Sequence, residues 1–154
     1  MAERNDTADR ELRLTRLLNA PIDLVWEVWT EPAHLAQWWG PNGFTNSISK
    51  MDVRDGGLWN LIMHGPDGTD YRNESVFVEV IKEKKLVYNH LTGPKFTATV
   101  LFEARGEKTH ITWHMLFATK EEFIHTVKTF NAAKGLIENG DRLDAYLTKN
   151  LTAK

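Results

Sequence analysis

Residues 44–118 most constrain the fold, because they form a succession of strand-like segments joined by very short connections. These connections are rich in glycine or charge and suit tight turns: Asp55-Gly56-Gly57, Gly65-Pro66-Asp67-Gly68, Lys82-Glu83-Lys84-Lys85 and Arg105-Gly106-Glu107-Lys108. Strands are predicted over residues 44–54, 58–64, 69–81, 86–91, 96–104 and 110–118. Because parallel pairing needs a crossover of about a dozen residues or more, the short links predict an antiparallel meander.

Two of these strands show which face of the sheet turns inward. Side chains alternate between faces along a strand, so every second residue shares one face. The apolar set is Trp59, Leu61 and Met63 in the strand over residues 58–64, and Ile111, Trp113, Met115 and Phe117 in the strand over residues 110–118. We expect these side chains to face the core.

A further strand and two short helices are predicted ahead of the meander. Residues 10–18 alternate apolar and polar side chains, as a strand does. Pro21 suits the first turn of one helix, and Thr30 is the expected N-cap of the next, which Gly40-Pro41 ends. Four of the six tryptophans lie within residues 26–39, and such a cluster favours a well-filled core or the wall of an apolar pocket.

The C-terminal region is predicted to be one long helix that contains two glycines. Thr119 and Glu122 match a capping box, so the helix should begin there and run towards Leu151. Gly135 and Gly140 each cost about 1 kcal/mol relative to alanine inside a helix. Either the helix breaks near Gly135, or Gly140 leaves room for a cavity between helix and sheet.

Length and composition indicate one ordinary globular domain. The 154 residues are predicted to form a flexible N-terminal tip over residues 1–9 and a single domain over residues 10–154. The net charge of -2 argues against nucleic acid as a partner, and the absence of cysteine excludes disulfides and thiol chemistry. No apolar run resembles a secretory signal or a membrane span, so a cytoplasmic location is expected.

Several segments of the chain resemble one protein family. They are Ala20-Pro21, Val25-Trp26, Thr30-Glu31-Pro32, Trp38-Trp39-Gly40-Pro41, Asp52-Val53-Arg54-Asp55-Gly56-Gly57-Leu58-Trp59 and Gly65-Pro66-Asp67-Gly68. They are similar to the bacterial single-domain family named after the activator of the heat-shock-protein-90 ATPase, within the START-like (SRPBCC) superfamily. The resemblance runs from about Leu12 to Leu151. It implies an α+β helix-grip fold, in which a curved antiparallel sheet of about seven strands wraps around a long C-terminal helix, with two short helices after the first strand.

A pocket in such a fold should lie between the concave sheet and the last helix. The candidate ligand-binding residues are Trp38, Trp39, Trp59, Leu61, Met63, Tyr71, His90, Trp113, Met115, Phe130, Leu136 and Gly140. Trp38 or Trp39 would stand near the mouth, while Tyr71 or His90 would meet a polar group of the ligand. The alternatives are that the apolar members only fill the core and that His90 lies at the surface.

Other chemistries find little support in the sequence. His110 and His114 lie about 13 Å apart on a strand, too far to share an ion, so neither a metal nor a cofactor is expected. No nucleophile stands beside a base in the sequence. Asp52 and Arg54 are expected to form an ion pair that fixes a turn. Glu79, together with Tyr71 and His90, is a candidate acid or base if the pocket is catalytic.

Three functions remain open at this level. The favoured hypothesis is a protein that is not an enzyme and binds a small hydrophobic molecule, lipid-like or aromatic, in the pocket. The first alternative is a cyclase- or hydrolase-type enzyme that uses the same pocket. The second is a stress-related, co-chaperone-like module that docks a chaperone. Either a monomer or a homodimer is expected.

Overall fold

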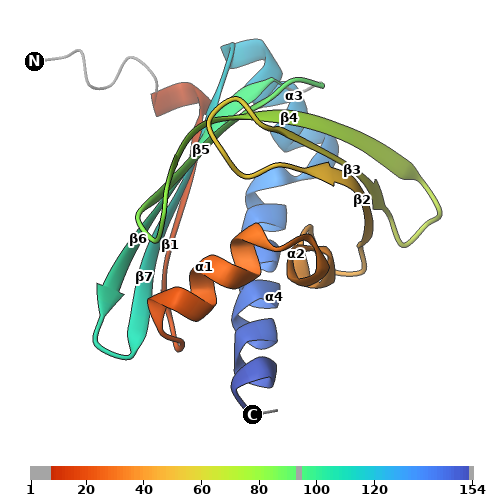
Figure 1. Cartoon of the computed structure of the whole chain (residues 1–154). Coiled ribbons are helices and arrows are strands. Elements are labelled where there is room, and N and C mark those ends of the chain that lie inside the picture. Colours follow the sequence, from red (N-terminus) through yellow and green to blue (C-terminus); the bar gives the residue numbers. More distant parts are fainter. Residues whose placement is uncertain (1–7, 93–94, 153–154) are drawn as a thin grey trace, which may run out of the picture.

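The computed structural model describes residues 8–92 and 95–152 and shows one curved antiparallel sheet around the last helix (Figure 1). Its strands are β1 (Glu11–Leu18), β2 (Thr45–Met51), β3 (Leu58–His64), β4 (Asp70–Ile81), β5 (Lys85–His90), β6 (Phe96–Arg105) and β7 (Lys108–Phe117). The strand order is β1-β7-β6-β5-β4-β3-β2. The predicted meander and the helix-grip fold are therefore confirmed, with β1 paired to the last strand rather than to its neighbour in sequence.

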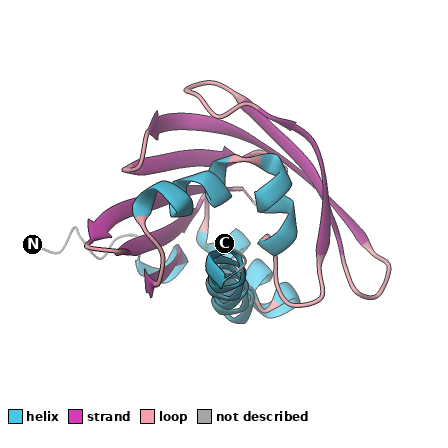
Figure 2. Cartoon of the chain, turned by 60° about the horizontal axis from the view of Figure 1, so that its bottom comes forward, coloured by secondary structure: helices cyan, strands magenta, loops and turns pink. Residues whose placement is uncertain are grey.

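The concave face of the sheet carries the predicted apolar residues. Trp59 and Leu61 of β3 are buried, as are Ile111 and Trp113 of β7. Figure 2 shows the strands arching around the helices, with the last helix seen end-on beneath the arch. Among the described residues, no helix is both long and apolar enough to cross a membrane.

The two short helices are α1 (Ile22–Thr30) and α2 (Pro32–Trp38), with boundaries slightly different from those predicted. Pro21 is the N-cap residue of α1 rather than part of its first turn. Thr30 closes α1, where its hydroxyl donates to the Trp26 carbonyl, so the prediction of Thr30 as an N-cap is wrong. The N-cap is Glu31, because a residue before proline avoids the helical region and Pro32 opens α2.

The C-terminal region contains two helices, α3 (Lys120–Phe130) and α4 (Ala132–Thr152). The cap at Thr119 is confirmed, since its hydroxyl oxygen accepts a 3.0 Å hydrogen bond from the Glu122 amide. The helices are separated by Asn131, whose φ of 52° is left-handed. A break near Gly135 was thus the right kind of prediction at the wrong residue. Asparagine tolerates the left-handed conformation that ends a helix, whereas glycine within a helix need not break it.

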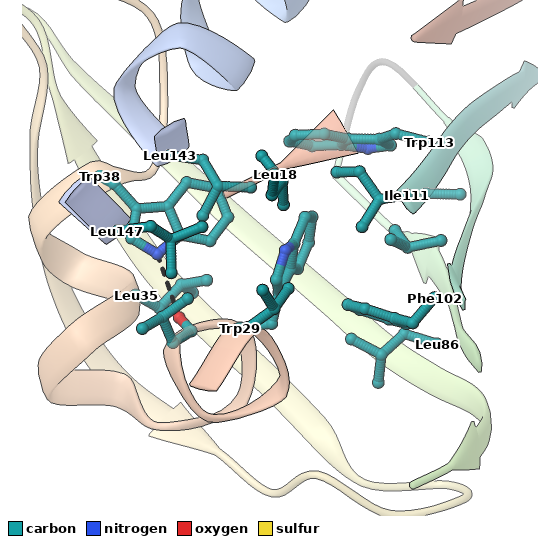
Figure 3. Packing of buried hydrophobic residues seen from close by; sticks show 14 of the residues in the cluster. Leu18, Trp29, Leu35, Trp38, Leu86, Phe102, Ile111, Trp113, Leu143 and Leu147 are labelled. Atoms are coloured by element: carbon teal, nitrogen blue, oxygen red, sulfur yellow. Dashed lines mark hydrogen bonds between the residues drawn. The ribbon is translucent and has the colours of Figure 1, made fainter. Parts of the chain in front are cut away.

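Aromatic rings fill the core beneath α1 and α2 (Figure 3). The indole of Trp29 meets those of Trp38 and Trp113 edge to face, at centroid distances of 4.8 and 4.9 Å. The Trp38 indole nitrogen donates to the Val28 carbonyl at 3.0 Å, which satisfies a buried polar group. Together with Leu143 of α4, these side chains form a solid core at this end of the molecule.

Gly140 lies where α4 packs directly on β1. A Cβ atom built there would be 2.7 Å from Leu14 Cδ2 and 3.3 Å from Arg16 Cζ. Arg16 also forms a 2.7 Å ion pair with Asp141 of α4. The expectation that Gly140 opens a cavity is therefore wrong. Its missing side chain lets helix and strand approach each other.

The predicted N-terminal tip falls mostly on residues 1–7, which lie outside the described residues. Ala8–Arg10 forms a short 3-10 helix, η2, directly before β1.

Candidate functional site

A cavity of about 790 Å³ lies between the concave sheet, the loop after α2 and the junction of α3 with α4. Strands β3, β4, β5, β6 and β7 each contribute side chains to its wall. Pockets for small molecules span about 300–1,000 Å³, so the space has the size of a binding site rather than of a packing defect.

The structure brings most of the predicted pocket residues together. Those that line the cavity are Trp39, Trp59, Leu61, Met63, Tyr71, His90, Trp113, Met115 and Leu136. Trp38 is fully buried in the core behind them, so Trp39 is the ring at the cavity. Gly140 packs on β1, as described above. Phe130 ends α3, and its side chain lies outside the described residues.

The tryptophan rings of the wall hold one another in place. Trp39 stacks on Trp113 with centroids 5.5 Å apart and meets Trp59 edge to face at 5.1 Å. Trp59 in turn contacts Tyr88 at 5.0 Å. Because each ring is fixed by a neighbour from another element, the apolar wall is formed in advance of any ligand.

One polar pair, of buried His90 and partly buried Asn73, interrupts this aromatic wall. His90 is 8% exposed, so the alternative of a surface position is wrong. Its ring stacks on Phe96 at 4.7 Å, and its Nε2 lies 2.6 Å from Oδ1 of Asn73. The Asn73 amide nitrogen donates to the Tyr71 carbonyl, so its oxygen is the acceptor and His90 Nε2 carries a proton. The pair gives the cavity a defined hydrogen-bonding point.

Tyr88 adds a second polar group that stays neutral. Burial raises the pKa of the Tyr88 phenol far above its ordinary value of 10.0. The hydroxyl therefore remains protonated at neutral pH. It can form hydrogen bonds as a neutral phenol, but it cannot act as a phenolate.

Arg142 of α4 holds the loop that forms one rim of the cavity. Its Nη1 donates to the carbonyls of Trp39, Gly40 and Pro41 at 3.1, 3.0 and 2.8 Å. Its Nη2 donates to the Phe44 carbonyl at 3.0 Å. Partial burial lowers the pKa of the guanidinium. The group remains charged, because the ordinary pKa of arginine is far above neutral pH. No pattern in the sequence indicates this role, because helical periodicity does not show which loop an arginine side chain will reach.

Two further side chains of α4 support the same rim. Asn139 is buried and donates its amide to the Trp38 carbonyl at 3.0 Å. Glu138 accepts a hydrogen bond from the Asn42 backbone amide at 3.1 Å. The loop that carries Trp39 is thus tied to α4 by Glu138 and Asn139 and, about one helical turn later, by Arg142.

The remaining candidates lie elsewhere. Glu79 is half-buried, pairs with Lys85 at 3.0 Å and does not line the cavity, so it is wrong as a pocket acid or base. Asp52 and Arg54 form the expected ion pair at 2.7 Å.

Across the described residues, no cluster of three or more histidines and carboxylates is suited to a metal ion. His114 pairs instead with Glu11 of β1 at 2.8 Å.

The chain matches one family model. The model is described as Activator of Hsp90 ATPase homolog 1-like protein, and the match covers residues 19–148. That span includes α1 and α2, the strands of the cavity wall and most of α4. Among curated proteins, none matches the chain.

Solved bacterial structures share the fold along nearly the whole chain. A protein from Nitrosomonas europaea is 27% identical, with a TM-score of 0.82 over 94% of this chain and 98% of that one. One from Arthrobacter aurescens is 23% identical, with a TM-score of 0.85 over 94% and 89% of the two chains. One from Mycobacterium smegmatis is 22% identical, with a TM-score of 0.80 over 97% and 95%. At the two lower identities the likeness shows the fold alone.

Proposed function

Since the chain belongs to the family of Activator of Hsp90 ATPase homolog 1-like proteins, we propose that it binds a small, largely apolar molecule in the cavity between the sheet and α4. The observation that carries this proposal is the 790 Å³ cavity with its wall of interlocked tryptophan rings. Burying an apolar ligand against such a wall supplies affinity at about 25 cal/mol per Å² of apolar area removed from water.

The wall also supports a preference for ligand shape. Trp39, Trp59 and Trp113 present ring faces and edges from three different elements. Flat aromatic or polycyclic ligands can stack on such rings, and ring contacts add about 0.5–1.5 kcal/mol beyond area burial. An aromatic ligand is therefore favoured over a plain alkyl chain.

The pair of Asn73 and His90 sets the ligand's polar end. Its 2.6 Å hydrogen bond lies within a predominantly apolar lining. A ligand group that hydrogen-bonds to this pair would be fixed in one orientation, because buried polar groups need partners. The proposed ligand thus has an apolar aromatic body and one polar group. A cytoplasmic location and the absence of catalysis in the cavity stay predictions.

The test blocks the cavity by a single substitution at Gly135. This residue lines the cavity in the first turn of α4, and a Cβ atom there would be 3.4 Å from Pro41 Cγ, an ordinary contact. Gly135→Phe therefore places a ring at the mouth without a backbone clash. The matched control is Ile137→Phe, because Ile137 lies on the same helix and is 50% exposed.

The probe is 1-anilinonaphthalene-8-sulfonate, an aromatic molecule with one anionic group whose fluorescence rises in apolar surroundings. We expect Gly135→Phe to weaken its binding at least tenfold and Ile137→Phe to leave it unchanged, with circular dichroism unaltered in both. Equal affinity in the two folded variants would overturn the proposal. Native mass spectrometry of the purified wild type would then identify any ligand that remains bound.

A further inference from the structure

Three polar side chains form a linear chain on the outer face of the sheet, where one of them, Asp70, also borders the cavity. The Ser47 hydroxyl oxygen lies 2.8 Å from His64 Nε2, and His64 Nδ1 lies 2.7 Å from an Asp70 carboxylate oxygen. We propose that Ser47, His64 and Asp70 form a hydrolytic site for small activated carboxylic esters. The site is independent of the ligand-binding proposal above.

The pairing register explains how three separate strands build this arrangement. β2 and β3 are side by side at one edge of the sheet, with Thr45 opposite His64 and Ser47 opposite Ile62. β4 follows β3, with Asp70 directly opposite His64. Strand alternation places these side chains on the face opposite the cavity-lining Met63 and Tyr71. Serine, imidazole and carboxylate thus lie on neighbouring strands of one face.

The protonation pattern follows from the acceptors. The Asp70 carboxylate, when ionised, can only accept, so His64 Nδ1–H must donate to it. In the neutral ring, Nε2 then has a lone pair and accepts from the Ser47 hydroxyl. A serine hydroxyl whose proton points at an imidazole held by a carboxylate is activated as a nucleophile for acyl transfer.

The reaction proceeds in two balanced steps. Ser47 Oγ attacks the ester carbonyl carbon while its proton passes to His64 Nε2; the carbon–oxygen bond to the alcohol breaks, and the alcohol leaves with that proton. Water then attacks the acyl carbon and gives a proton to Nε2. The Ser47 oxygen–acyl bond breaks, Ser47 regains a proton, and the carboxylic acid departs. Ester and water become acid and alcohol, with no net oxidation.

The exposure of the site determines the substrate class. Ser47 is exposed, and the side chains of His64 and Asp70 are 35% and 62% exposed. Water reaches all three, so the catalysis is modest and needs esters with a good leaving group. Ile62, 38% exposed and opposite Ser47, gives an apolar surface for an acyl or aryl group. A positioned general base contributes about 10²–10⁴-fold.

The experiment measures hydrolysis of p-nitrophenyl acetate. We expect Ser47→Ala and His64→Gln to lower the initial rate at least tenfold. The matched controls are Ser49→Ala, an exposed serine on the same strand, and His110→Gln, a histidine on β7 that reports background imidazole activity. Both controls should keep the wild-type rate. A wild-type rate in Ser47→Ala would overturn the proposal.

A covalent readout separates a nucleophile from a structural serine. After rapid acid quenching, mass spectrometry of wild-type peptides should show one acetyl group on Ser47, and none in the His64→Gln protein. An acetyl group mapped only to lysines or other side chains would overturn the assignment. Asp70 acts as a positioning residue, so Asp70→Ala should lower the rate and Asp70→Glu should restore part of it.

Discussion

The guanidinium of Arg142 donates to the carbonyl of Pro41 at 2.8 Å, which fixes the rim loop of the cavity to the middle of α4. The same group also serves the carbonyls of Trp39, Gly40 and Phe44. A single side chain thus connects the C-terminal helix to the loop that places Trp39 in the cavity wall. Stability and the shape of the cavity are coupled through it.

Replacing Arg142 should therefore lower the stability of the fold and release the rim loop of the cavity. We expect Arg142→Met to lower the free energy of unfolding by about 2–4 kcal/mol, because several partly buried carbonyls lose their donors. Arg142→Lys should recover only part of the loss, since an ammonium cannot match the planar fork. Urea unfolding measures the change. A loss below about 0.5 kcal/mol in Arg142→Met would contradict this role.

The two glycines of α4 should respond in opposite directions to the same substitution. Gly140→Ala pushes a methyl group to 2.7 Å from Leu14 Cδ2, so we expect a net destabilisation of about 1 kcal/mol or more despite the gain in helix propensity. Gly135→Ala meets only Pro41 at 3.4 Å and should stabilise by up to about 1 kcal/mol. The unfolding temperatures of the two variants, compared with wild type, measure these changes. Stabilisation by Gly140→Ala as well as by Gly135→Ala would show that α4 does not pack tightly on β1.

The buried phenol of Tyr88 predicts a loss of stability in alkali. Burial raises its pKa in the folded state above the value of 10.0 that it has when exposed. Above pH 10 the unfolded chain releases this proton while the folded protein keeps it, so this contribution to stability is complete below about pH 10 and falls by about 1.4 kcal/mol per pH unit above it. The free energy of unfolding, measured with urea between pH 9 and 11, should fall less steeply with pH in Tyr88→Phe than in wild type. Identical slopes would contradict the prediction.

The polar point at His90 can be tested with two probes that differ in one group. His90→Phe removes the donor to Asn73 Oδ1 while keeping an aromatic ring against Phe96. We expect about tenfold weaker binding of 1-anilinonaphthalene-8-sulfonate, about 1.4 kcal/mol, and little change for the uncharged N-phenyl-1-naphthylamine. Fluorescence titration of both probes decides the matter. An equal loss for the two would indicate a general change of cavity shape instead of a lost polar contact.

Local patterns in the sequence predicted the strands and the inward face, because alternation at Trp59, Leu61 and Met63 depends only on strand geometry. They placed the helix break at Gly135 instead of Asn131, because propensity identifies residues that weaken a helix but does not show where the chain must turn. The candidate pocket was predicted in large part through the resemblance to known helix-grip proteins.

Contacts between distant segments could not be predicted in the same way. Ser47, His64 and Asp70 meet only through the register of three strands, and register depends on how turns and core packing combine. The sequence pattern suggests a cavity at Gly140, but Leu14 fills that space. Leu14 lies on a strand more than a hundred residues earlier in the chain, so no local pattern reveals the contact.

The pairing of β1 with β7 has a consequence for how the chain acquires its shape. Glu11 is paired with Leu116 and Leu18 with Thr109, so β1 can pair only after β7, the last strand of this sheet in sequence, has been synthesised. Contacts of such sequence separation slow folding, since a long loop must close before they form. Until then the edge of β7 that β1 will cover is open to other strands, including those of neighbouring chains. The interval between the formation of β7 and its pairing with β1 is therefore the stage at which this sheet is most prone to pair with another chain.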